Sequence, residues 1–131
     1  MKVLVTGGAG FIGSNLLLYL HEKYPQSQFL NIDKLGYASD RSYLDPIKKS
    51  NRYTFKKLDI VDREAVRDIV QSYQPEAVFH LAAESHVDNS IKGPEPFIQS
   101  NVVGTFNLLE ECRQLWQQDD QKWAGNRFLH V

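Results

Sequence analysis

A glycine-rich turn at residues 6–14, Thr-Gly-Gly-Ala-Gly-Phe-Ile-Gly-Ser, constrains the possible fold more than any other stretch. It follows a short apolar run (2–6) that is typical of a buried parallel strand. It also opens a segment (10–24) whose apolar residues recur at helical spacing. The glycines fit G-x-G-x-x-G from Gly8 and G-x-x-G-x-x-G from Gly7. Such spacing allows a tight turn, close packing of helix on strand, and approach of an anion to the helix N-terminus. The sequence therefore predicts a strand–turn–helix unit that can bind a pyrophosphate.

Strand-like and helix-like segments alternate along the rest of the chain. Strands are expected at 2–6, 28–33, 53–60, 76–83 and from 127 onward, and helices at 10–24, 62–73 and roughly 96–117. The last of these helices is expected to carry one apolar stripe, formed by Ile98, Val102, Leu109, Cys112 and Trp116. Residues 36–51 are polar and contain Asp45-Pro46, which favours a loop with at most one helical turn. This alternation implies a parallel sheet with helices on both faces, joined by right-handed crossovers. We therefore expect a Rossmann-like, doubly wound α/β fold in one domain over residues 1–131.

Composition narrows the classes of function. The 131 residues include 15 Lys and Arg against 16 Asp and Glu, a formal net charge of -1, so we expect no nucleic-acid partner. The N-terminal apolar run is too short for a signal peptide, and no later run reaches membrane-spanning length. The only cysteine, Cys112, excludes a disulfide framework and is interpreted as a small core residue. A cytoplasmic protein without a membrane partner is expected.

Asp33 follows the glycine turn at the distance of a ribose-binding acid. It lies twenty residues beyond Gly13, at the end of the predicted second strand. A carboxylate there can accept hydrogen bonds from both hydroxyls of an adenosine ribose and would repel a 2′-phosphate. Lys34 beside it could offset part of this repulsion, but NAD is the preferred cofactor. The alternative, a glycine turn without a ligand, is disfavoured because strand, helix and acid all occur in the expected order.

Five stretches resemble the extended short-chain dehydrogenase/reductases over essentially the whole chain. They are TGGAGFIGS, NIDKLGYA (31–38), LDI (58–60), HLAAESHVDNSI (80–91) and NVVGT (101–105). The glycine turn is shared by the superfamily, whereas DKLxYA together with HLAAESHVDxS is similar to the dTDP-glucose 4,6-dehydratases. The resemblance implies NAD-dependent dehydration of dTDP-glucose to dTDP-4-keto-6-deoxyglucose. It also implies a homodimer formed through helix 96–117 and a further helix beyond this sequence.

The resemblance assigns cofactor roles to matching positions. The pyrophosphate would meet the glycine turn and the amides that follow it, at Gly7, Gly10, Phe11, Ile12 and Gly13. The adenosine would be bound by Asp33, Lys34, Leu35, Gly36, Asp59 and Ile60. The nicotinamide ribose would lie over Leu81, Ala82, Ala83 and Ser85, with Ser100 near the cofactor. Small residues at the end of the fourth strand independently leave room for a flat ring. Ser85 is also expected to contact the sugar, and His86 and Asp88 to shape the substrate pocket.

Several polar residues also have a structural interpretation. His80 and His130 lie within predicted strands and are interpreted as structural, and His21 lies in the last turns of the first helix. His86, in a loop at the ligand edge, is as compatible with substrate contact as with none. The four histidines lack metal-ligand spacing, so no metal site is expected. Asp59 could alternatively cap the helix that begins near 62.

The final stretch, Arg-Phe-Leu-His-Val (127–131), begins a strand. The resemblance implies that this strand leads into a Ser-Thr-Asp-Glu stretch and then a Tyr-x-x-x-Lys pair, which the sequence does not contain. We therefore expect an incomplete Rossmann domain, truncated in or just after strand five, without a substrate domain. It would contain no catalytic residue and be inactive alone. The alternatives are another NAD-dependent nucleotide-sugar enzyme, such as a 4-epimerase or a UDP-glucuronate decarboxylase, a non-catalytic NAD-binding module, or a remnant reading frame.

Overall fold

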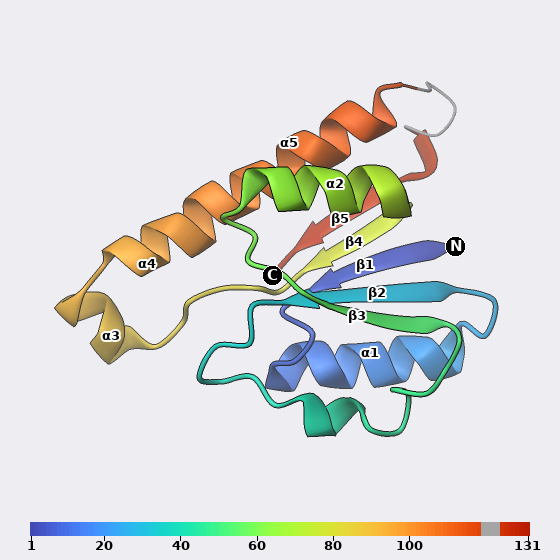
Figure 1. The fold of residues 1–131 in the computed structure, drawn as a ribbon, viewed down its shortest axis with the longest axis horizontal. Helices are drawn as coiled ribbons and strands as arrows, with labels where there is room; N and C mark the ends of the chain where they lie inside the picture. The colour runs from blue at the N-terminus through green and yellow to red at the C-terminus, as the bar shows by residue number, and fades with distance from the viewer. Residues whose placement is uncertain (119–123) are drawn as a thin grey trace.

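Five parallel strands form the centre of the molecule (Figure 1). The structure, a computed structural model, describes residues 1–118 and 124–131. The strands are β1 (Lys2–Thr6), β2 (Gln28–Asp33), β3 (Tyr53–Lys57), β4 (Ala77–His80) and β5 (Arg127–His130), and their order is β3-β2-β1-β4-β5. Every neighbouring pair is parallel, with Val3 opposite both Phe29 and Ala77. The expected doubly wound α/β fold is confirmed.

One face of the sheet is covered by α1 (Phe11–Lys23) and the short 3₁₀ helix η1 (Arg41–Leu44) (Figure 1). Strand alternation sends Val3 and Val5 to this face and Leu4 to the other. The cluster under α1 consists of Val3, Val5, Leu17, Leu20, Phe29, Leu44, Ile47 and Ala77. The one helical turn allowed for 36–51 is therefore present as η1.

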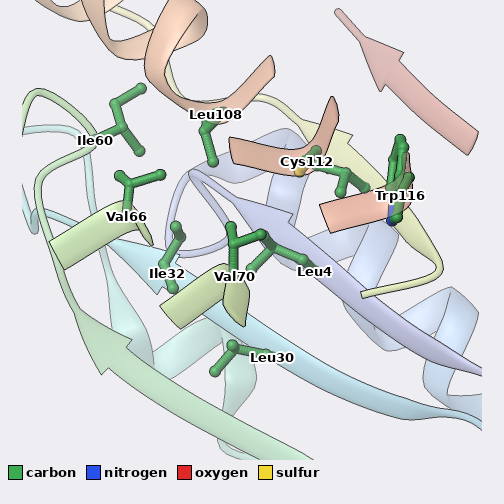
Figure 2. Packing of buried hydrophobic residues seen from close by; sticks show 10 residues of the cluster. Leu4, Leu30, Ile32, Ile60, Val66, Val70, Leu108, Cys112 and Trp116 are labelled. Carbon is green, nitrogen blue, oxygen red and sulfur yellow. The ribbon is translucent and has the colours of Figure 1, made fainter. Parts of the chain in front are cut away.

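The opposite face is covered by α2 (Arg63–Tyr73) and α5 (Thr105–Trp116). Figure 2 shows their apolar side chains meeting those of the sheet. The cluster consists of Leu4, Leu30, Ile32, Ile60, Val66, Val70, Val78, Leu108, Cys112 and Trp116. Burial raises the pKa of Cys112 to about 12, with Glu111 adding to the shift, so this thiol is protonated. Cys112 is confirmed as a core residue.

The path into α5 begins with α3 (Val87–Lys92) and α4 (Glu95–Phe97) and continues through the π-wound segment η2 (Ile98–Gly104). The expected helix 96–117 is present as the continuous path from α4 to α5. The five residues of the expected apolar stripe do not share one buried face. Cys112 and Trp116 are buried, whereas Ile98, Val102 and Leu109 are 55%, 56% and 46% exposed. The short helix α3 was not predicted.

The strands end earlier than their apolar runs suggest. β3 ends at Lys57 and β4 at His80, so residues 58–60 and 81–83 lie beyond the sheet as irregular backbone. This places both segments in loops at the carboxyl edge. Among the described residues, no helix is long and apolar enough to cross a membrane.

Candidate functional site

A cleft of about 450 Å³ lies beyond the carboxyl ends of the central strands. The chain runs from β1 outward to β2 and β3 and then crosses to β4, so the direction of winding reverses beside β1. Such a switch point leaves a crevice in an open parallel sheet. The cleft is lined by these expected residues: Gly7, Gly10, Phe11, Ile12, Gly13, Asp33, Lys34, Gly36, Asp59, Ile60, Leu81, Ala82, Ala83, Ser85 and Ser100. Leu35 and His86 are not part of its lining.

Two glycines of the turn are required by the fold itself. Gly7 has φ +70°, and a Cβ built on it would lie 2.7 Å from the amide nitrogen of Ala82. A Cβ on Gly13 would lie 2.3 Å from the carbonyl oxygen of Gly7. Both positions therefore exclude any side chain, because these contacts involve backbone that cannot move aside. Gly7 thus lets the turn pack against the segment that follows β4, and Gly13 lets α1 pack against the turn.

Gly10 is different. Its φ is -79°, which any residue adopts, and a Cβ there would meet only the Gly7 carbonyl oxygen, at 3.3 Å. Gly10 occupies the N-cap position of α1, and no side chain caps the first-turn N–H groups. An uncapped helix N-terminus lined by glycine attracts anions. The fold does not require glycine at this position, but a pyrophosphate in the cleft would.

Asp33 is held in place at the end of β2 and is 7% exposed. Its Oδ2 accepts a hydrogen bond from the Ala9 amide at 3.0 Å. Its Oδ1 accepts from the Leu35 amide at 2.8 Å and from Ser39 Oγ at 3.0 Å. Leu35 has φ 61°, a left-handed turn that brings its amide back to the carboxylate. Since a carboxylate offers about four lone-pair sites, roughly one remains for a further donor.

Lys34 reaches across the cleft rather than toward Asp33. Its Nζ forms an ion pair with Glu84 Oε1 and donates to Ser100 Oγ at 3.2 Å. Glu84 is fixed in turn by Asn101: the Glu84 amide donates to Asn101 Oδ1 at 2.8 Å, and Asn101 Nδ2 donates to the Glu84 carbonyl at 2.9 Å. Lys34 follows β2 and Glu84 follows β4, with β1 between those strands, so the pair spans the switch point.

His80, the last residue of β4, connects β4 to β1 and α5 next to the cleft. Its Nδ1 lies 2.6 Å from Thr6 Oγ1 and its Nε2 2.8 Å from Thr105 Oγ1, and the ring is buried. Thr6 Oγ1 also accepts from the Ala82 amide at 3.1 Å, which leaves the Thr6 hydroxyl proton for His80. Burial, and to a smaller extent His130, lowers the pKa of His80 from 6.5 to about 4. The interpretation of His80 as a structural residue is confirmed, since the ring is buried and hydrogen-bonded at both nitrogens.

The wall after β3 is formed by Asp59 and Ile60. Asp62, not Asp59, caps α2, because its side chain accepts from the Ala65 amide at 3.0 Å. Asp59 Oδ1 accepts from the Val61 amide at 3.1 Å, and Asp59 lines the cleft. The capping alternative for Asp59 is therefore wrong.

Several lining residues were not singled out from the sequence. They are Ile32, Tyr37, Ala38, Ser39, Leu58, Glu84 and Val131. Tyr37 is 67% exposed and packs edge-on against His86, with ring centroids 6.0 Å apart. Glu84 carried a usable signal, since it is a lone charge among the small residues of HLAAES. Within the described part of the chain, no group of three or more His, Cys, Asp or Glu side chains could hold a metal ion.

Comparison with known proteins gives consistent results. The family described as GDP-mannose 4,6 dehydratase matches residues 4–131. A dTDP-glucose 4,6-dehydratase of Haemophilus influenzae is 48% identical over all of this chain, which spans 39% of that protein. A crystal structure of dTDP-glucose 4,6-dehydratase from Bacillus anthracis in complex with NAD matches with a TM-score of 0.81 and 29% identity, covering 100% of this chain and 37% of that one.

A third similar protein is the dTDP-glucose 4,6-dehydratase of Streptomyces venezuelae, with NAD and TYD bound. It matches with a TM-score of 0.78 and 39% identity over 88% of this chain and 36% of that one. The chain thus spans little more than a third of the length of these relatives, corresponding to their N-terminal part. On the strength of the family match over residues 4–131, the chain belongs to the GDP-mannose and dTDP-glucose 4,6-dehydratase family of short-chain dehydrogenase/reductases.

Proposed function

We propose that this chain is the NAD-binding portion of a dTDP-glucose 4,6-dehydratase. The observation that carries the proposal is Gly10, whose missing side chain has no sufficient reason in the fold but opens the N-terminus of α1 to the cleft. A pyrophosphate there would accept hydrogen bonds from the Phe11 and Ile12 amides. The NAD complex of the Bacillus anthracis relative supports this choice of cofactor.

The rest of the cleft fits the remaining parts of NAD. The adenosine ribose would bind Asp33, with its second hydroxyl replacing Ser39 Oγ because the carboxylate has about one site left. Asp59 and Ile60 would contact the adenine, and Lys34, Leu35 and Gly36 would flank the adenosine. Leu35 would act through its amide, which already orients Asp33.

The nicotinamide end would lie over the segment after β4. Leu81, Ala82 and Ala83 are small or apolar and line the cleft, which leaves space for a flat ring. NAD would supply the hydride acceptor and donor, and the residues of this chain would bind and orient it. Ser85 would face the glucosyl unit, His86 would shape the edge of that pocket, and Ser100 would lie beside the cofactor.

The long helical path supports a homodimer as part of the same proposal. Four half-exposed apolar side chains lie along it at helical spacing: Ile98, Val102, Phe106 and Leu109. In a protein that carries this chain at the length of its relatives, they would pack against a second copy. Sedimentation of that protein should give a dimer, and Phe106→Glu should shift it toward monomer. If that longer protein sediments as a monomer without any substitution, the proposed homodimer is refuted.

Calorimetry tests the proposed cofactor site directly. The chain is titrated with NAD and, separately, with NADP, and saturable binding of one NAD per chain is expected. Absence of heat and of thermal stabilisation with NAD would overturn the proposal. Incubation of dTDP-glucose with the protein of full family length tests the reaction, since formation of a 4-keto sugar nucleotide is expected.

A further inference from the structure

We propose that Glu84 determines cofactor selectivity by holding the ammonium group of Lys34 away from the ribose. This inference rests on the proposed NAD site and adds a residue that acts on the choice between NAD and NADP. The choice depends on charge near the ribose 2′ position, where a carboxylate favours a hydroxyl and a cation favours a phosphate. Lys34 is adjacent in sequence to Asp33, so its charge is the first to consider.

The contacts of Lys34 show where that charge is directed. Its Nζ is shared between Glu84, which follows β4, and Ser100 on η2. The hydrogen bonds described for Asp33 come from Ala9, Leu35 and Ser39, and none comes from Lys34. The Lys34 side chain therefore points away from the neighbouring Asp33 carboxylate and extends across the switch point.

Glu84 is suited to hold the lysine because it is itself anchored. Its backbone exchanges two hydrogen bonds with Asn101 on η2. Its side chain is 16% exposed, compared with 37% for Lys34, so the carboxylate is the more fixed partner. A long lysine stem is flexible, and its position is set by the fixed charge it meets.

The pairing leaves Asp33 as the deciding charge. Lys34 and Glu84 together carry no net charge, so a 2′-phosphate at the ribose would meet the Asp33 carboxylate without a compensating cation. Without the Glu84 charge, as in Glu84→Gln, Lys34 would keep only hydrogen bonds to neutral acceptors, the amide oxygen at 84 and Ser100 Oγ, and its charge could pair with a phosphate. Glu84 thus acts through Lys34, as a positioning residue.

The experiment measures dissociation constants for NADH and NADPH by fluorescence titration of the parent chain and of three variants. Glu84→Gln should shift the NADPH-to-NADH affinity ratio about tenfold in favour of NADPH, because one lysine–phosphate contact becomes available. The double variant Lys34→Met/Glu84→Gln should return to the parent ratio. Glu95→Gln, the same charge change at an exposed position of α4, should leave the ratio unchanged.

The outcomes separate the two proposals. An unchanged ratio in Glu84→Gln, equal weakening of both cofactors, or a double variant that stays relaxed would overturn the role of Glu84 and leave the NAD site standing. A folded parent chain that binds neither cofactor would overturn the NAD site and this inference together. Thermal unfolding of each variant confirms that a changed ratio comes from a folded chain.

Discussion

Gly10 and Gly13 lie three residues apart in one turn, yet the structure predicts opposite consequences for the same substitution. In Gly10→Ala the new methyl group meets one carbonyl oxygen at 3.3 Å, and φ stays in the allowed region. The loss of folding stability should be about 1 kcal/mol, because alanine is a poorer N-cap than glycine. In Gly13→Ala the methyl group would lie 2.3 Å from the Gly7 carbonyl oxygen and 2.7 Å from the Gly8 Cα.

The two variants should also lose NAD binding for different reasons: Gly10→Ala because the binding site is blocked, and Gly13→Ala because the chain unfolds. Gly10 lines the cleft, so its new methyl group would take up space proposed for the pyrophosphate and would displace it from the first-turn amides of α1. Loss of two charge-assisted hydrogen bonds, each worth about 1.5–3 kcal/mol, corresponds to at least a hundredfold weaker binding. Gly13→Ala should lose NAD binding only in so far as the chain unfolds, at a cost of roughly 3 kcal/mol or more from backbone overlap.

Two measurements test this pair. Urea unfolding gives the stability of each variant, and calorimetry with NAD gives the affinity of the folded fraction. The prediction is a stable Gly10→Ala that binds NAD at least a hundredfold more weakly than the parent chain, and a destabilised Gly13→Ala. Parent-like NAD affinity in Gly10→Ala would refute the placement of the pyrophosphate at the N-terminus of α1, because a bound pyrophosphate and the methyl group would need the same space.

Further predictions concern three polar side chains. Asp33→Ala should weaken NAD binding and relax the rejection of NADP, and calorimetry showing unchanged selectivity would count against its role at the ribose. In the protein of full family length, Ser85→Val should lower turnover of dTDP-glucose more than NAD affinity, because an unpaired sugar hydroxyl costs about 1–3 kcal/mol; equal losses would show that Ser85 serves only the cofactor. His80 has a pKa lowered from 6.5 to about 4, so the unfolded chain binds more protons between these values and stability must fall as pH drops through that window. The loss attributable to His80 should approach about 3 kcal/mol at pH 4, and urea unfolding of His80→Gln should show a shallower pH dependence, whereas an identical dependence would contradict the assignment.

The sequence was most informative where structure depends on near neighbours. The glycine turn, the helix after it and Asp33 are fixed by short-range spacing, and each lies where the spacing predicted. The ends of β3 at Lys57 and of β4 at His80 were harder to predict, because an apolar run does not reveal where strand pairing stops. The loops that follow keep apolar residues because they line a cleft rather than a sheet.

The long helix shows a different limit. Helical spacing assumes 3.6 residues per turn throughout, but the π-wound segment η2 changes the phase between its two ends. Val102 in η2 and Cys112 in α5 share a stripe at regular helical spacing, yet they point to solvent and to the core respectively. Leu109 is also exposed although it lies in α5 with the buried Cys112, so the winding of η2 accounts for only part of the division. Periodicity groups apolar residues near one face, but it does not show which of them the rest of the fold covers.

The partner of Lys34 illustrates what local reasoning leaves open at the site itself. From the sequence, a lysine beside the ribose-binding acid could weaken the preference for NAD. The answer depends on Glu84, fifty residues away along the chain, which the fold brings to the opposite side of β1. A short-range pattern can place a charge at the cleft, but only the tertiary structure shows which other charge it serves. The sequence and the tertiary structure lead to the same expectation here: because Lys34 is paired with Glu84, the Asp33 carboxylate would be left to select the proposed cofactor.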